Sequence, residues 1–227
     1  MTVTTTSLVK AAGAAAAVAG GIFIAVQVNH PPHDAFTTET TQWVARSCAK
    51  MVMSVLALAG ITGMYLRQHT RMGVLGLTGY LLFAVGYLSM FATQVIAAVV
   101  LPQLVDTQPG FVNDVVASAV GAVPEGDIGS VQLLFNVTGV GYMLGGLVFG
   151  IALVRSGVLA RWAAALLAVS TVATASLAFL PEAFDRPMAV PEAIALIGLG
   201  VSLWRSTGST PAVAPVRRTP VAESVAR

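Results

Sequence analysis

The sequence predicts an all-α protein, a polytopic membrane helix bundle of six transmembrane helices with both termini in the cytoplasm. The chain of 227 residues is 56% hydrophobic and only 10% charged, whereas soluble domains carry about 25% charged residues. Six apolar stretches approach the ~20 residues that a helix needs to cross a membrane. The basic residues also alternate between connections as the positive-inside rule requires. The expected spans are 11–28, 47–66, 73–100, 131–154, 159–180 and 188–204.

The first span, 11–28, is rich in small residues, which allow helices to approach closely in a membrane. One set repeats every four residues and a second set lies beside it: Ala12, Ala16 and Gly20, then Gly13, Ala17 and Gly21. The segment could instead be a cleaved signal peptide, although its 18 apolar residues exceed the usual 7–15. Cleavage would leave five spans and an amino end outside.

The loop after the first span holds His30, His33 and Asp34. Imidazole and carboxylate groups can bind zinc or copper. However, Pro31 and Pro32 keep this stretch extended and separate the two rings. We therefore expect a solvated turn here, and no metal site.

The second span has an apolar part, 51–66, that is only about 24 Å long at 1.5 Å per residue. The hydrocarbon layer is about 30 Å thick, so 47–50 should complete the helix and Lys50 should lie near the outer boundary. Two alternatives remain open for this residue. Lys50 either extends to the lipid headgroups or faces the bundle and pairs with an acid.

The long loop 101–130 contains a helical pattern after Pro109 and Gly110. Apolar residues recur at the spacing i, i+3, i+4 and i+7: Val112, Val115, Val116 and Ala119, with Phe111 and Val120 widening the face. The loop should therefore form a short amphipathic helix at the outer interface. It would either cover helix ends or act as a lid over an outward-facing cavity.

The fourth span carries two pairs of glycines spaced by four residues: Gly141 and Gly145, and Gly146 and Gly150. Such faces suit close helix contact. They would pack within the monomer or, alternatively, form a homo-oligomer.

Polar residues in the spans gather near the outer ends of the helices. The candidate buried polar cluster consists of Glu192, Lys50, Arg46, Asn136, Gln132 and Gln94. Glu192 lies 12 residues before Trp204, or about 18 Å along a helix, so we expect it inside the hydrocarbon and facing the bundle. Lys50 or Arg46 should supply a cation to it, and Asn136 or Gln132 hydrogen bonds. Because Pro191 precedes Glu192, the helix either begins at Pro191 or is kinked from Met188.

The charges orient the spans. Nine of the twelve basic residues share one side: Lys10, Arg67, Arg71, Arg155, Arg161, Arg205, Arg217, Arg218 and Arg227. The other side holds Arg46, Lys50 and Arg186, with nine of the ten acids. The first side is therefore expected to be cytoplasmic, and 101–130 external. Trp162 and Trp204 mark the inner interface, and Trp43 the outer one.

Other chemistry has little support. Cys48 is the only cysteine, which excludes an intrachain disulfide and a cysteine-based metal cluster. No predicted span contains histidine or aspartate, which disfavours a haem held by two imidazoles and an intramembrane protease. Nucleotide-binding motifs and basic stripes for nucleic acid are also missing. We expect no cofactor, no metal and no catalytic residue, and an enzyme is the least favoured class.

Four short motifs resemble a group of small six-helix bacterial integral membrane proteins of unknown function. They are Gly110-Phe111-Val112-Asn113-Asp114, Gly126-Asp127-Ile128-Gly129, Arg161-Trp162-Ala163-Ala164 and Ser202-Leu203-Trp204-Arg205. The resemblance covers most of 8–206 and implies the six-helix fold. It implies no site residue.

The expected organisation is one membrane domain, 1–205, followed by a disordered cytoplasmic tail, 206–227, which contains three prolines and no periodicity. We expect a multi-pass protein of the bacterial plasma membrane, with membrane lipids as partners. It would bind or pass a small or lipidic molecule through the outward-facing polar cluster. The alternative is a membrane-structural or partner-binding subunit that packs through its glycine faces.

Overall fold

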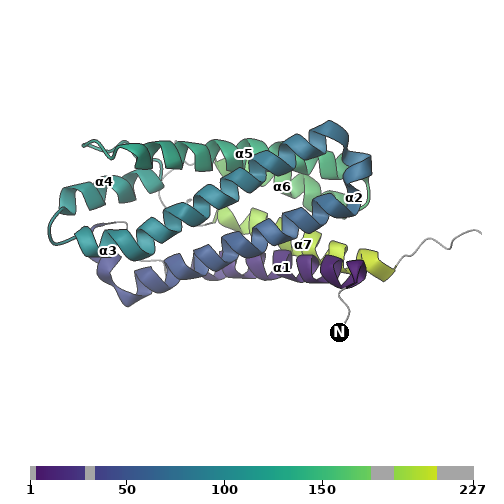
Figure 1. Ribbon diagram of the computed structural model, residues 1–227, viewed down its shortest axis with the longest axis horizontal. Coiled ribbons are helices and arrows are strands. Elements are labelled where there is room, and N and C mark those ends of the chain that lie inside the picture. Colours follow the sequence, from purple (N-terminus) through teal and green to yellow (C-terminus); the bar gives the residue numbers. More distant parts are fainter. Residues whose placement is uncertain (1–3, 29–33, 175–186, 209–227) are drawn as a thin grey trace, which may run out of the picture.

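The computed structural model describes residues 4–28, 34–174 and 187–208. These residues form helices along one long axis, and no β-strand occurs among them (Figure 1). The long helices are α1 (Thr5–Ala25), α2 (Thr41–Val95), α5 (Ser130–Ser156), α6 (Arg161–Ala173) and α7 (Ala189–Arg205). The short ones are η1 (Phe36–Glu39), η2 (Ile96–Val100), α3 (Leu101–Leu104), α4 (Pro109–Ala119) and η5 (Ser206–Gly208). The all-α prediction is confirmed, and the predicted tail beyond 208 lies outside the described residues.

Helix α2 covers both the second and the third predicted spans, and the chain reverses direction inside it. Gln68 and Gly73 have non-helical backbone angles, and Gly73 has φ 57° and ψ −152°, a region essentially restricted to glycine. The first arm begins at Thr41, earlier than predicted. The side chain of Thr40 accepts a hydrogen bond from the Trp43 N–H and caps the helix. Apolar length alone could not reveal this polar first turn.

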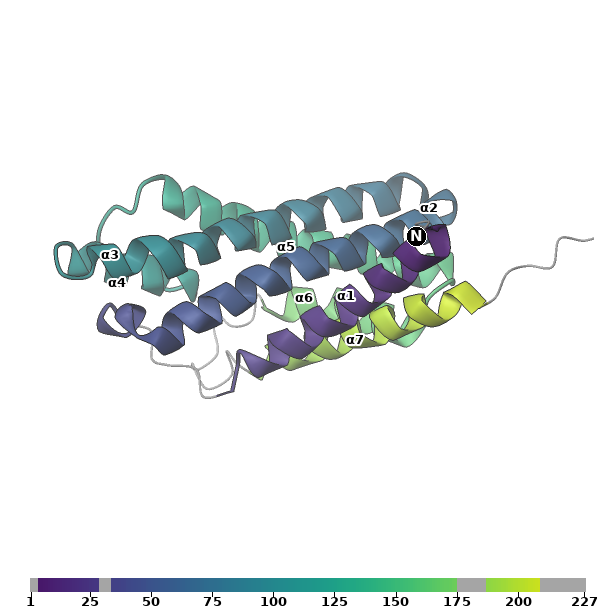
Figure 2. The ribbon, with the colours of Figure 1, turned by 60° about the horizontal axis from the view of Figure 1, so that its bottom comes forward.

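The helical segments neighbour one another in a closed order. Helix α1 packs against α2 and α7, α5 packs against α2 and α6, and α6 packs against α7. Figure 2 shows α1 and α7 side by side. Residues far apart in the chain therefore meet in the core, which contains the aromatic rings of Phe83, Tyr87 and Phe149.

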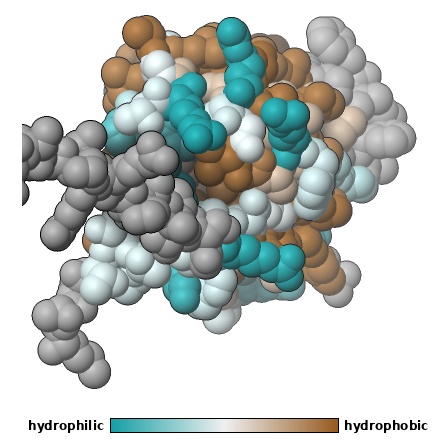
Figure 3. All heavy atoms as spheres, turned by 90° about the vertical axis from the view of Figure 1, so that its right-hand side faces the viewer, coloured by the Kyte–Doolittle hydropathy of each residue, from teal (hydrophilic) through white to brown (hydrophobic). Residues whose placement is uncertain are grey.

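The two ends of the bundle differ in charge. At one end the turn in α2 meets the end of α7, where Arg67 donates to the carbonyl of Ser206 at 3.2 Å. This "arginine end" carries Lys10, Arg67, Arg71, Arg155, Arg161 and Arg205, and hydrophilic side chains stand out on it in Figure 3. The opposite "loop end" comprises residues 34–40 and 101–129. Apart from the buried Glu192, every acid in the described ranges belongs to the loop end.

Three helical segments are long and apolar enough to cross a membrane: Thr5–Ala25, Thr41–Leu104 and Ser130–Ser156. The second includes both arms of α2. Within the described ranges, α6 has 13 residues and α7 has 17, so both are shorter than a full span.

The small residues of α1 form two faces, one packed against α2 and the other against α7. Ala12 and Ala16 pack against Gly63 and Gly60 of α2. Gly13 and Gly20 instead face backbone atoms of Gly200 and Ala193 in α7. A Cβ on Gly13 or Gly20 would collide with α7, which is the close approach that small residues permit, whereas Gly21 has nothing within 4 Å.

The four glycines of α5 are likewise used inside the chain. Gly141 and Gly145 lie against the backbone of α2 at Gly86 and Phe83, while Gly146 and Gly150 lie against Thr171 and Ala168 of α6. All four are buried. Of the two uses that the sequence left open, the structure therefore shows packing within the monomer. These glycines offer no exposed face to a second copy.

Candidate functional site

Glu192 lies in the first turn of α7, which begins at Ala189. The sequence left open whether this helix begins at Pro191 or is kinked from Met188. In the structure Pro191 lies in the first turn of α7, where its missing N–H breaks no intrahelical bond. Glu192 is 1% exposed, as predicted. Its position near the helix N-terminus also favours a negative charge through the helix dipole.

The partners of Glu192 are two tyrosines. Tyr87 of α2 donates from its hydroxyl to Oε1 at 3.3 Å, and Tyr142 of α5 donates to Oε2. The two rings meet edge to face with centroids 5.9 Å apart. Glu192 thus connects three helices, α2, α5 and α7. Such interhelical hydrogen bonds stabilise membrane bundles and hold the helices in one register.

The predicted partners of Glu192 were wrong. The Arg46 guanidinium donates to the carbonyl of Val26 at 2.7 Å, at the C-terminal end of α1. Gln132 and Asn136 bond to each other at 3.1 Å on α5. Both groups lie nearer the loop end than Glu192 does, because α7 begins deeper in the bundle than the first arm of α2. The candidate cluster is therefore divided among separate sites.

Lys50 and Gln94 line a cavity of about 140 Å³ at the loop end, between α2, η2, α4 and α5. The buried hydroxyl side chains of Ser47 and Thr93 line it too. Lys50 is half-buried and faces into the bundle, so the alternative in which it points to lipid does not apply. The cavity combines one cation with hydroxyl and amide groups.

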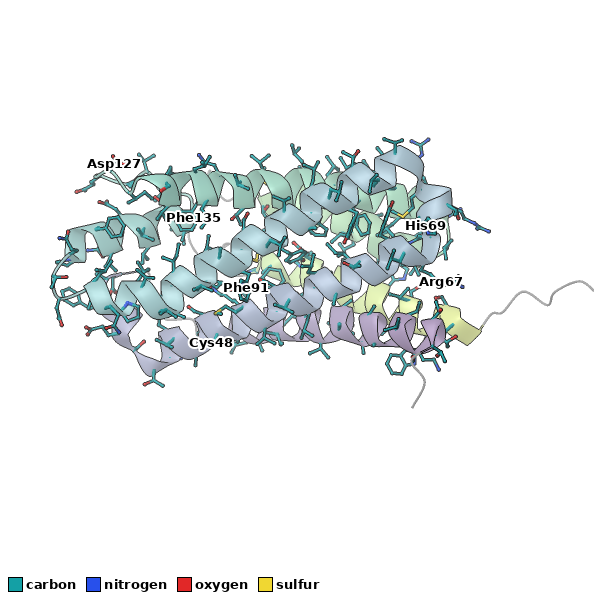
Figure 4. The ribbon with its side chains drawn as sticks, viewed as in Figure 1. Cys48, Arg67, His69, Phe91, Asp127 and Phe135 are labelled. Atoms are coloured by element: carbon teal, nitrogen blue, oxygen red, sulfur yellow. The ribbon has the colours of Figure 1, made fainter. Side chains whose placement is uncertain are left out.

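The other walls of this cavity are apolar. Trp43 and Phe135 contribute aromatic rings, and Figure 4 shows Phe135 close to α4. Val115 and Val116 of α4 complete the wall and are 2% and 1% exposed. A pocket with apolar walls and a few polar groups is the usual form of a small-molecule site.

Helix α4 confirms the amphipathic helix predicted in the long loop. Its valines pack inward, and its polar residues connect it to the loops on either side. Asn113 accepts a hydrogen bond from the Ala35 N–H at 2.7 Å, and Asp114 accepts from the Glu125 and Gly126 N–H groups at 2.9 and 3.1 Å. These bonds attach α4 to two other segments and position it over the cavity.

The cavity borders the widened turn η2. Pro102 follows this turn, and a proline ring clashes with the carbonyl four residues earlier in a regular helix. The wider turn relieves that clash, and such turns are frequent at functional sites. Trp43 donates from Nε1 to the carbonyl of Ala97 in η2 at 3.0 Å. Trp43 is buried, so it does not mark the lipid interface as predicted.

Sequence reasoning missed Tyr87 and Tyr142, although one signal was present. The pair Gly-Tyr occurs three times, and two of these, Gly86-Tyr87 and Gly141-Tyr142, lie near the middle of apolar spans, whereas Gly79-Tyr80 lies near the start of one. A tyrosine hydroxyl in hydrocarbon requires a partner. The predicted solvated turn at His30 and His33 lies outside the described residues.

No family model matches the chain, and neither does any curated protein or solved structure. The geometry of the chain's own residues is therefore the basis for its function.

Proposed function

We propose that this protein is a multi-pass membrane protein that binds a small amphipathic anion in the cavity at its loop end. The observation that carries this proposal is Lys50 in a cavity with aromatic walls. The ammonium group would pair with the anion, and Ser47, Thr93 and Gln94 would supply hydrogen bonds. Trp43 and Phe135 would cover the apolar part of the ligand.

The size of the cavity limits the ligand. A cavity of about 150 Å³ is known to hold a molecule such as benzene, and this one has about 140 Å³. A short-chain or aromatic carboxylate therefore fits better than a complete lipid. In this proposal α4 serves as the lid.

We also propose that six helices span the bacterial plasma membrane, with the arginine end in the cytoplasm. The charge difference between the two ends supports this orientation. The cavity would then open to the outside.

Binding is favoured over passage, because the core between the two ends is filled by rings such as Phe83 and Phe149. The alternative, a subunit that packs through its glycine faces, receives no support from α5. The four glycines of that helix already contact α2 and α6.

Calorimetry on the purified protein would test the proposed binding with benzoate as the probe and benzamide as the uncharged counterpart. We expect benzoate to bind and benzamide to bind much more weakly. Lys50→Gln should weaken benzoate binding about tenfold or more, since it removes a charge-assisted hydrogen bond. Lys10→Gln, the matched change at the arginine end, should leave benzoate binding unchanged.

A second variant, Ala119→Phe, places a ring in the cavity from an exposed position on α4. It should block benzoate while the protein remains folded. Equal affinity for benzamide and benzoate, or full benzoate affinity in folded Lys50→Gln protein, would refute the proposal.

A further inference from the structure

A second, apolar groove lies between α5 and α6, away from the cavity at the loop end. It has a volume of about 640 Å³, and its walls include Leu147, Ile151, Val169 and Val172. Val169 is 66% exposed, so the groove opens to the surroundings of the bundle. A membrane-facing groove of this chemistry suits a hydrocarbon chain.

The groove ends at a basic site. Arg155 belongs to its lining, and the same residue lines a neighbouring hollow of about 240 Å³ together with Arg71 of α2. Acidic side chains in the described part of the chain are absent from this end of the bundle. The two arginines therefore form a cationic site directly beside the apolar groove.

We infer that this groove binds an anionic phospholipid, with the acyl chain between α5 and α6 and the phosphate at Arg155 and Arg71. Charge complementarity selects this occupant. A neutral hydrocarbon would leave the two guanidinium groups without a counterion from the described residues, whereas a phosphate accepts hydrogen bonds from both. Basic pockets between membrane helices bind anionic headgroups in this way. The inference goes beyond the proposed function, since it concerns a different ligand at the opposite end.

Native mass spectrometry of the full-length protein in neutral detergent would test it. Phosphatidylglycerol and phosphatidylethanolamine with identical acyl chains are the two probes, and glycerol phosphate is the headgroup alone. We expect phosphatidylglycerol to bind in preference to the other two. Arg71→Gln and Arg155→Gln should each reduce its affinity about fivefold, and together about twentyfold. Lys10→Gln removes a charge from the same end but not from the groove, and should have no effect.

The apolar half of the site needs its own variant. Ala165 is exposed and lines the groove, so Ala165→Phe would occupy the space of the acyl chain without disturbing the core. We expect this folded variant to lose phosphatidylglycerol. Equal binding of phosphatidylethanolamine, equal binding of glycerol phosphate, or unchanged affinity in the double arginine variant would each overturn the inference. A dimer that forms in place of the lipid complex would do the same.

Discussion

At the scale of single residues, the main feature is a buried acid stabilised without a cation among its described partners. Glu192 receives one hydroxyl on each carboxylate oxygen and lies at the positive end of a helix. Ionisable groups inside membrane bundles commonly mark function. Here the contacts join α2, α5 and α7, which favours a role in fixing their register.

Replacing Tyr142 by Phe should show what this contact contributes. Tyr142→Phe leaves one buried carboxylate oxygen without its donor, and we expect the free energy of unfolding in detergent to fall by about 1–3 kcal/mol. Tyr65 is a suitable control, because it is half-buried and stacks on Tyr80 but lies outside the Glu192 group. Tyr65→Phe should have little effect, and equal losses in both variants would contradict the assignment.

A combined variant distinguishes a structural role from a functional one. The triple change Tyr87→Phe, Tyr142→Phe and Glu192→Leu removes every member of the buried polar group. The double variant Tyr87→Phe and Tyr142→Phe, which keeps Glu192, is the reference. The triple variant should regain much of the stability that the double variant loses, because no buried oxygen remains unsatisfied. Thermal unfolding provides the measurement. A triple variant that is less stable than the double variant would argue against this account.

At the scale of helices, the pairing of elements depends on where small residues allow two helix backbones to come into contact. A Cβ on Gly86 would lie 2.6 Å from the backbone nitrogen of Tyr142, so α2 and α5 touch through their backbones there. The same contact brings Tyr87 and Tyr142 close together. The glycines therefore determine the site as well as the packing.

Gly86→Ala should separate α2 from α5 and destabilise the protein by about 1–3 kcal/mol, the usual cost of overpacking. Gly139→Ala on α5 is the matched control, because nothing lies within 4 Å of its added methyl group. That change should be neutral or should stabilise by up to about 1 kcal/mol through helix propensity. Chemical denaturation of both variants would compare them, and a tolerated Gly86→Ala would show that the contact is looser than described.

At the scale of the whole molecule, apolar side chains cover the outside of the helices while charges gather at the two ends. Val74, Leu133 and Val169 are each more than 60% exposed. Such a surface agrees with the three helical segments that are long and apolar enough to cross a membrane. In the topology proposed above, the arginine end and the loop end face opposite sides of the membrane.

This arrangement predicts which positions a membrane-impermeant maleimide can reach in intact cells. With Cys48 replaced by Ser, Val123→Cys at the loop end should be labelled and Thr70→Cys at the arginine end should not. Figure 4 shows the two ends through the labelled neighbours Asp127 and His69. Both cysteines should react after lysis, which controls for accessibility. Labelling of position 70 alone in intact cells would reverse the orientation.

The sequence by itself determined the helices, because apolar length and spacing act locally. The reversal near Gly73, the amphipathic helix over Val112–Val116 and the separation of charge all follow from residues near one another in the chain. It also determined that Glu192 would be buried, since an acid lies in a long apolar stretch.

Only the tertiary structure decided which side chains meet. Apolar helices in lipid have little hydrophobic preference for one neighbour over another, so close approach of small residues selects the pairs. That selection gave Glu192 two tyrosines in place of Lys50 or Arg46, and it placed the glycines of α5 inside the monomer. Lys50 lines a cavity under α4 and does not meet Glu192, because α7 begins too deep in the bundle for Glu192 to reach the loop end.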